Sequence, residues 1–152
     1  MIELELPSLP ISINRAYTHT LMSKGGGRVV VRILTAAGRK YKEESISHLA
    51  RNYPKELNKI EKNKPYLVYI TLYLEDLVVK GWPNKAKSRY KKLDATNCIK
   101  LLEDVLAEVS AVDDSNNLVV VVQKKLGPER TVIRIWDLED EDTPFDAGIR
   151  AQ

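Results

Sequence analysis

Apolar and polar positions in residues 93–114, LDATNCIKLLEDVLAEVSAVDD, repeat with the period of an α-helix. If residues 97–109 are helical, a step of 100° per residue gathers one apolar face, made of Cys98, Leu102, Val105, Leu106 and Val109. The opposite arc is polar and holds Asn97, Lys100 and Asp104. The pattern therefore predicts an amphipathic helix whose apolar face packs in the core.

Both ends of this predicted helix are acidic. Asp94 stands where a helix N-cap, or the turn before it, is expected. Asp113 and Asp114 follow a short exit segment, residues 110–112. The helix separates two acidic ends, and these ends meet only if the following loop or strand returns toward the start of the helix.

Several strands are predicted by β-branched and aromatic runs. Residues 2–6 alternate apolar and acidic, as in a half-buried strand. Residues 66–74, YLVYITLYL, have almost no polar face and suit a central strand covered on both sides. Residues 118–124 and 131–136 flank a turn at 126–129, which predicts an antiparallel hairpin.

The N-terminal third is less regular. Residues 7–20, PSLPISINRAYTHT, predict a loop in which Asn14, Arg15 and Tyr17 either face a ligand or satisfy local backbone groups. Residues 24–27 predict a flexible tip that leads into a strand or hairpin arm at 29–33. Thr35 is a suitable N-cap for a charged amphipathic helix at 36–51, and a second helical segment is expected at 55–62, after Tyr53-Pro54.

These elements predict an α/β (α+β) fold with one domain, in which helices pack on a mixed β-sheet. A chain of 152 residues is long enough to bury a sizeable core without a metal or a disulfide. We expect residues 1–136 to form the domain and residues 137–152 to be an acidic, flexible C-terminal tail. The single cysteine, Cys98, is expected to be a buried and inert core residue in a reducing compartment.

Charge is divided unevenly along the chain. The formal net charge is +3, but residues 1–136 hold 23 Lys and Arg against 15 Asp and Glu, a net +8. Such a body favours an anionic partner, and an acidic tail either competes with that partner or simply keeps the protein soluble. The start of the chain has no signal-peptide pattern, and no apolar run approaches a membrane span, so we expect a cytoplasmic protein with no membrane partner.

A basic segment precedes the central helix. Residues 80–92, KGWPNKAKSRYKK, contain six Lys and Arg, no acid, one Trp and one Tyr. This mixture is typical of a mobile loop that contacts phosphates and stacks on a base or sugar, although many basic loops are only solvated. Its position directly before Asp94 favours the functional interpretation.

The acidic ends are suited to phosphodiester chemistry. Mg²⁺ prefers carboxylate oxygens, and Asp94, Asp113 and Asp114 are suitable ligands if they converge. Lys100 is placed to stabilise developing negative charge, or it only forms an i,i+4 ion pair with Asp104. The sequence lacks the motifs of other common active sites. The two histidines have no partner at the spacing of a zinc site, no GxSxG elbow marks a serine nucleophile, and no glycine loop is suited to bind phosphate.

The stretch LDATNCIKLLEDVLAEVSAVDDSNNL, followed by VVVVQKK, resembles the RusA family of Holliday junction resolvases. The core of that family reads Asp-x-Asp-Asn-x-x-Lys, then a helix with an Asp, then Asp-Asp, then a strand that ends in Lys. PISINRAY and LTAAGRKYKEE also resemble the family's Pro-x-Ser-x-Asn-x-x-Tyr and Ser-x-x-Gly-x-x-Tyr signatures. The resemblance spans about residues 10–135, and several signatures in the right order make it specific.

The resemblance assigns roles residue by residue. It places the first metal-binding carboxylate on Asp94 and the family Lys on Lys100. The second acidic site falls on Asp113 and Asp114, of which Asp114 is the better match. The supporting positions are Thr96, Asn97 and Asp104.

Thr96 departs from the family pattern, because it replaces the second Asp of Asp-x-Asp-Asn. A neutral hydroxyl is a weaker Mg²⁺ ligand than a carboxylate, so Asp113, Asp104 or water fills that role, or activity is reduced.

The resemblance implies a homodimeric, Mg²⁺-dependent endonuclease, with Mn²⁺ able to substitute, that binds branched DNA and resolves four-way junctions by paired symmetric nicks in recombination and repair. Many members are carried by phages. The residues expected to contact DNA are Asn14, Arg15, Lys85, Lys87, Arg89, Lys91, Lys92, Lys124 and Lys125. Two alternatives stay open: a branched-DNA-binding protein with lost or weak cleavage, and a nuclease that prefers flaps or forks.

Overall fold

The apolar run at residues 66–74 forms strand β4 (Tyr66–Leu74), the central strand of the larger sheet in the computed structural model. The structure describes residues 1–139 and 143. The sheet has the order β1-β6-β4-β5, where β1 is Ile2–Leu6, β5 is Asn117–Leu126 and β6 is Arg130–Asp137. Strand β5 runs parallel to β4, whereas β6 runs antiparallel to both β4 and β1. The predicted mixed sheet is confirmed.

The predicted β5–β6 hairpin is wrong. Although the two strands are adjacent in the sequence, β6 pairs with β1 and β4, and β4 lies between β5 and β6. The connecting turn passes across the end of β4, where the Gly127 amide donates to the Leu74 carbonyl at 2.9 Å. A Cβ at Gly127 would stand 2.8 Å from the Tyr73 ring, so the turn passes closely over this ring.

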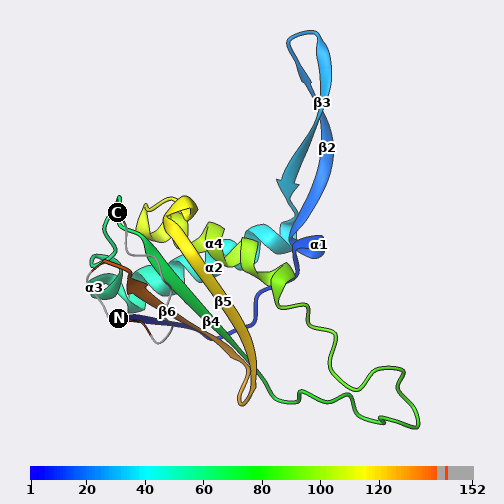
Figure 1. Cartoon of the computed structure of the whole chain (residues 1–152). Helices are drawn as coiled ribbons and strands as arrows, with labels where there is room; N and C mark the ends of the chain where they lie inside the picture. The colour runs from blue at the N-terminus through cyan, green and yellow to red at the C-terminus, as the bar shows by residue number, and fades with distance from the viewer. Residues whose placement is uncertain (140–142, 144–152) are drawn as a thin grey trace.

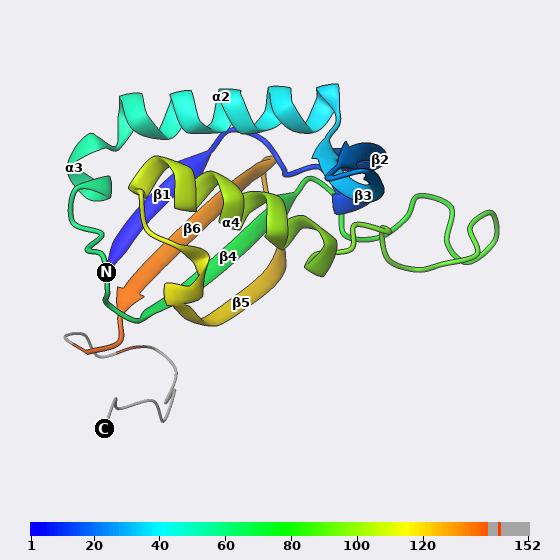
Figure 2. The same ribbon diagram turned by 90° about the horizontal axis from the view of Figure 1, so that it is seen from above.

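Helix α2 (Ala36–Asn52) and helix α4 (Thr96–Ser110) lie together over one face of the sheet, with the short helix α3 (Pro54–Leu57) at one end (Figures 1 and 2). The helix expected at 55–62 is therefore shorter and begins at Pro54. Thr35 caps α2 as predicted, because its hydroxyl accepts a hydrogen bond from the Gly38 amide at 3.1 Å. The helices face the alternate β4 side chains Tyr66, Val68, Ile70, Leu72 and Leu74.

The opposite face of β4 is closed differently. Leu67 and Thr71 are fully buried there, and Thr71 accepts a hydrogen bond from Gln123 at 3.0 Å. The rings of Tyr69 and Trp136 meet edge to face at 6.4 Å between centroids. The apolar run was expected to be covered on both sides, but the helices cover one side and the sheet's own side chains close the other.

Residues 7–20 are more ordered than the predicted loop. They contain helix α1 (Ile13–Ala16) and the start of strand β2 (Tyr17–Lys24), which pairs with β3 (Gly27–Leu34) in a separate two-stranded sheet. This β2–β3 hairpin projects away from the rest of the protein (Figure 1). Residues 17–20 are mostly polar, so burial does not explain their extended conformation. Hydrogen bonding to β3 holds this segment extended.

One close backbone contact anchors the base of this hairpin. Gly38 in α2 is buried, and a Cβ built on it would stand 2.3 Å from the Ala16 carbonyl oxygen. The Thr35 amide donates to the same oxygen at 2.9 Å. Only glycine allows α1 and α2 to approach this closely.

No helix among residues 1–139 and 143 is long and apolar enough to cross a membrane. The expected acidic tail begins at Asp137, the last residue of β6, and residues 140–142 and 144–152 lie outside the described residues. The prediction of a flexible tail is therefore not tested.

Candidate active site

The central helix of the sequence analysis is α4, one residue longer at each end than predicted. Its apolar face is confirmed, since Cys98, Leu102 and Val105 are fully buried and Leu106 nearly so. Leu101 is also fully buried and was missing from the predicted face. Burial raises the pKa of the Cys98 thiol, which favours the inert neutral form at this position.

Asp94 organises the start of α4. Its Oδ1 accepts from the Thr96 hydroxyl at 2.6 Å and the Thr96 amide at 3.1 Å, and its Oδ2 accepts from the Asn97 side chain at 2.9 Å. These hydrogen bonds lower the pKa of Asp94 below its ordinary value, and the bond from the Thr96 hydroxyl has the largest effect. Thr96 and Asn97 therefore hold Asp94 as an exposed, ionised carboxylate.

Lys100, one turn further on, connects two acids. Its ammonium lies 2.8 Å from Asp114 Oδ2 and 3.0 Å from Asp104 Oδ1. Hydrogen bonds to Asp114 and then Asp104 raise the pKa of Lys100, so the side chain is a permanent cation. The i,i+4 ion pair between Lys100 and Asp104 that the sequence suggested is present, and Asp114 is the third member of the cluster.

Tyr17 joins this cluster from a distant part of the chain. Its hydroxyl donates to Asp104 Oδ2, and the Arg32 guanidinium lies 4.3 Å from the centre of its ring. Burial, followed by the hydrogen bond to Asp104, raises the pKa of Tyr17 to about 12. The hydroxyl therefore remains a donor at neutral pH, and it links the base of the β2–β3 hairpin to Lys100.

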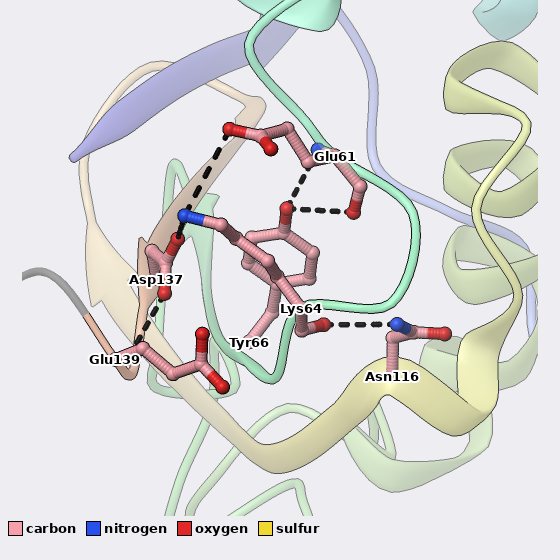
Figure 3. Close-up of polar contacts among 6 residues, drawn as sticks. All are labelled: Glu61, Lys64, Tyr66, Asn116, Asp137 and Glu139. Atoms are coloured by element: carbon pink, nitrogen blue, oxygen red, sulfur yellow. Dashed lines mark hydrogen bonds and ion pairs between the residues drawn. The ribbon is translucent and has the colours of Figure 1, made fainter.

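The acidic exit of α4 is held by the short 3₁₀ helix η1 (Asp114–Asn116). Asp113 caps it by accepting from the Ser115 amide at 2.9 Å, and hydrogen bonds from Ser115 lower the pKa of Asp113. Figure 3 shows Asn116 donating to the Lys64 carbonyl at 2.9 Å, which ties η1 to the loop before β4. This anchor places Asp114 within reach of Lys100.

The Lys64 loop is itself pinned to the end of β6. Lys64 forms an ion pair with Asp137 at 2.7 Å, and the Tyr66 hydroxyl donates to the Glu61 carbonyl at 2.9 Å (Figure 3). The position of η1 thus depends on contacts among the loop before β4, the start of β4 and the end of β6.

Glu103 lies on the same helix as Lys100 and Asp104 and was not among the predicted site residues. Burial, and then the charge of Asp114, raise the pKa of Glu103. It lies three residues after Lys100, so counting along the helix face would have placed it near the acidic exit. The Tyr17–Asp104 contact had no such signal, because 87 residues separate the two side chains.

The predicted DNA-contacting residues fall into three groups. Asn14 and Arg15 are exposed on α1, and Lys85, Lys87, Arg89, Lys91 and Lys92 are exposed on the long segment between β4 and α4. A bridge between Val78 and Tyr90 closes this segment into a loop. Lys124 donates to the Leu93 carbonyl at 2.8 Å, so it steadies the residue before Asp94, while Lys125 is exposed.

The carboxylate, hydroxyl and amide oxygens at the two ends of α4 are the kind of ligands that a hard divalent cation prefers. Asp104 and Asp114 already hold one cation, the Lys100 ammonium, between them. Among the described residues, no three His, Cys, Asp or Glu side chains lie close enough together to hold a metal ion. Asp94, Asp113 and Asp114 therefore do not form one compact cluster, and their role as ligands stays a prediction.

An ionised surface acid, a lysine held between two carboxylates and a basic loop are suited to phosphoryl transfer. The chain matches the family model described as Endodeoxyribonuclease RusA over residues 10–136. A search of curated proteins finds no significant match. The chain belongs to the RusA family of endodeoxyribonucleases, which confirms the resemblance and makes this protein a hydrolytic DNA nuclease of the Holliday junction resolvase class.

Proposed function

We propose that this protein resolves four-way DNA junctions as a homodimer, by paired symmetric nicks that depend on Mg²⁺ or Mn²⁺. The observation that carries the proposal is the ion pair of Asp114 with Lys100, which lies on the helix that the ionised Asp94 precedes, in a chain of this family. A two-fold junction requires two equivalent active sites, which a symmetric dimer supplies.

Asp94, Asp113 and Asp114 are the ligands that we propose for the cation, although the described residues do not gather them into one compact cluster. When bound, the cation would neutralise charge on the phosphate and on the attacking and leaving oxygens. Lys100 contributes a fixed positive charge next to Asp114, and Tyr17 and Asp104 keep its ammonium in place. Thr96 supports Asp94 by donating its hydroxyl to the carboxylate.

The wild-type protein, incubated with Mg²⁺ and a labelled four-way junction, is expected to nick opposed strands at symmetry-related positions. Forks and flaps of the same sequence serve as competing substrates. Faster cleavage of forks or flaps would reassign the substrate, and intact junction binding without cleavage at any divalent ion concentration would leave only a binding protein.

Asp94→Asn should bind the junction like the wild type but cut it at least about a hundredfold more slowly. The substitution deletes one carboxylate charge and keeps the size of the side chain. The amide oxygen can still accept from Thr96, whereas Asn97 loses its acceptor. Single-turnover nicking rates and junction binding without divalent ions measure the two effects separately. Cleavage at the wild-type rate would remove Asp94 from the site.

We also infer that the loop at residues 80–92 binds phosphates. Lys91→Ala combined with Lys92→Ala should weaken junction binding and flatten its dependence on salt, by about 0.9 in the slope of log K against log[salt] for each phosphate that the loop no longer neutralises. Anisotropy titrations at several salt concentrations give this slope. A slope equal to that of the wild type would mean that these lysines do not contact phosphates.

A further inference from the structure

Within the described residues, the main contacts of the β2–β3 hairpin with the rest of the protein lie near its base, at α1, α2 and the Tyr17–Asp104 hydrogen bond. Its outer part is exposed on both faces. An isolated two-stranded hairpin is marginally stable in water. Each strand has eight residues, so the hairpin is about 27 Å long at ~3.4 Å per residue. A projecting ribbon of this size is suited to contact a large, extended partner.

The charge of this region favours one kind of partner. Residues 6–42 contain seven Lys and Arg and no Asp or Glu. The register pairs His19 with Arg32 and Ser23 with Arg28, so the two arginines and His19 share one face with Tyr17. The exposed apolar pair Leu21 and Val30 lies on the same face, between the two arginines. The side chains of His19, Arg28 and Arg32 are exposed. We call this the basic face of the hairpin.

The opposite face carries no acid either. It is formed by Thr18, Thr20, Met22, Val29, Val31 and Ile33, with Lys24 next to the turn. Exposed apolar side chains on a hairpin can also mark a contact with another protein chain. Charge decides between the partners here, because a second copy of this chain would bring a matching basic face into the same region.

The position of the hairpin relates it to the candidate active site. In both views, the hairpin and the loop between β4 and α4 leave the body at the end where α4 begins (Figures 1 and 2). The first residue of β2, Tyr17, donates to Asp104, which contacts Lys100. A nucleic acid bound along the basic face would therefore lead to the Lys100 cluster.

We propose that the β2–β3 hairpin is a DNA-binding ribbon whose basic face, His19, Arg28 and Arg32, contacts the phosphate backbone of one arm of the substrate. A two-stranded ribbon fits the major groove of B-DNA. This inference rests on the proposed function and adds a binding surface that residues 80–92 do not provide.

Charge removal tests the proposal. Arg28→Gln with Arg32→Gln should weaken junction binding about fivefold to tenfold at 0.15 M salt and lower the salt slope by about 1–2. Lys55→Gln with Lys59→Gln is the matched control, because it removes the same charge from exposed residues in and just after α3, remote from the hairpin (Figure 2). Binding and slope equal to those of the control would overturn the proposal.

Photocrosslinking distinguishes DNA from a second copy. Cys98 is fully buried, so a cysteine introduced at exposed Ser23, on the basic face, can be labelled selectively with a photoreactive group. Ser23→Cys should crosslink to the junction, and Ser47→Cys, exposed on α2, should not. A crosslink from Ser23→Cys to another protein chain instead of DNA would overturn the proposal. If the wild type binds no junction at all, the proposed function fails; if it binds but position 23 does not crosslink to DNA, the ribbon alone fails.

Discussion

Asp114→Asn is expected to abolish junction cleavage, by at least about a hundredfold, while junction binding stays within about twofold of the wild type. The substitution removes the carboxylate charge that lies 2.8 Å from the Lys100 ammonium and that we propose as a metal ligand. Asp104 still holds Lys100 at 3.0 Å, so the lysine stays near its place and the loss is attributed to Asp114 itself. Single-turnover nicking of a labelled four-way junction measures the rate.

The matched control for Asp114→Asn is Glu108→Gln. This substitution removes the same charge, but Glu108 lies on the surface of α4, where it pairs with Lys42 at 2.6 Å. Surface pairs of this kind contribute at most about 1 kcal/mol, so this variant should cut at the wild-type rate. An equal loss of rate in both variants would mean that net charge alone controls cleavage, and a wild-type rate for Asp114→Asn would remove Asp114 from the site.

Gly38→Ala is expected to destabilise the fold by about 2 kcal/mol, because the strain exceeds the roughly 1 kcal/mol that alanine gains over glycine in a helix. The added Cβ would stand 2.3 Å from the Ala16 carbonyl oxygen and 2.9 Å from its carbonyl carbon, and both atoms are backbone. Helices α1 and α2 would have to separate. Thermal unfolding should occur roughly 4–8 °C lower.

Gly27→Ala is the control for Gly38→Ala. The atom nearest to the added methyl group would be the Lys24 carbonyl oxygen at 3.8 Å, and Gly27 has no positive φ. The melting temperature of this variant should therefore match that of the wild type. If Gly38→Ala also unfolded at the wild-type temperature, the close approach of α1 to α2 would be unnecessary for stability.

Local patterns predicted the elements that bury a clear apolar face. Helix α4, strand β4 and the Thr35 cap of α2 were all predicted within a residue or two. The order of the strands was not predicted. The sequence of the turn at 126–129 is compatible both with a β5–β6 hairpin and with a turn that crosses the end of β4. In β6, Ile133 is fully buried and Ile135 nearly so, as expected for a strand that lies between two others, β1 and β4.

The same limit applies to the site. The spacing of Asp94, Lys100 and Asp104 along one helix could be read from the sequence, and the resemblance assigned Asp114. The contact between Lys100 and Asp114 requires η1 to be anchored by Asn116, which is a tertiary effect. Tyr17 reaches Asp104 from the end of α1, which approaches α2 closely at Gly38, and no local pattern encodes these distances.

The connection between the parallel strands β4 and β5 also bears on how the protein folds. It contains the loop at residues 80–92, α4 and η1, and therefore every carboxylate of the candidate site. Parallel pairing across such a long crossover, together with β1 pairing to β6 near the other end of the chain, gives many contacts between distant residues and favours slow folding. Until β5 pairs with β4, the return segment that carries Asp114 has no fixed place beside Lys100. The newly made chain should therefore acquire nuclease activity only in the final steps of folding.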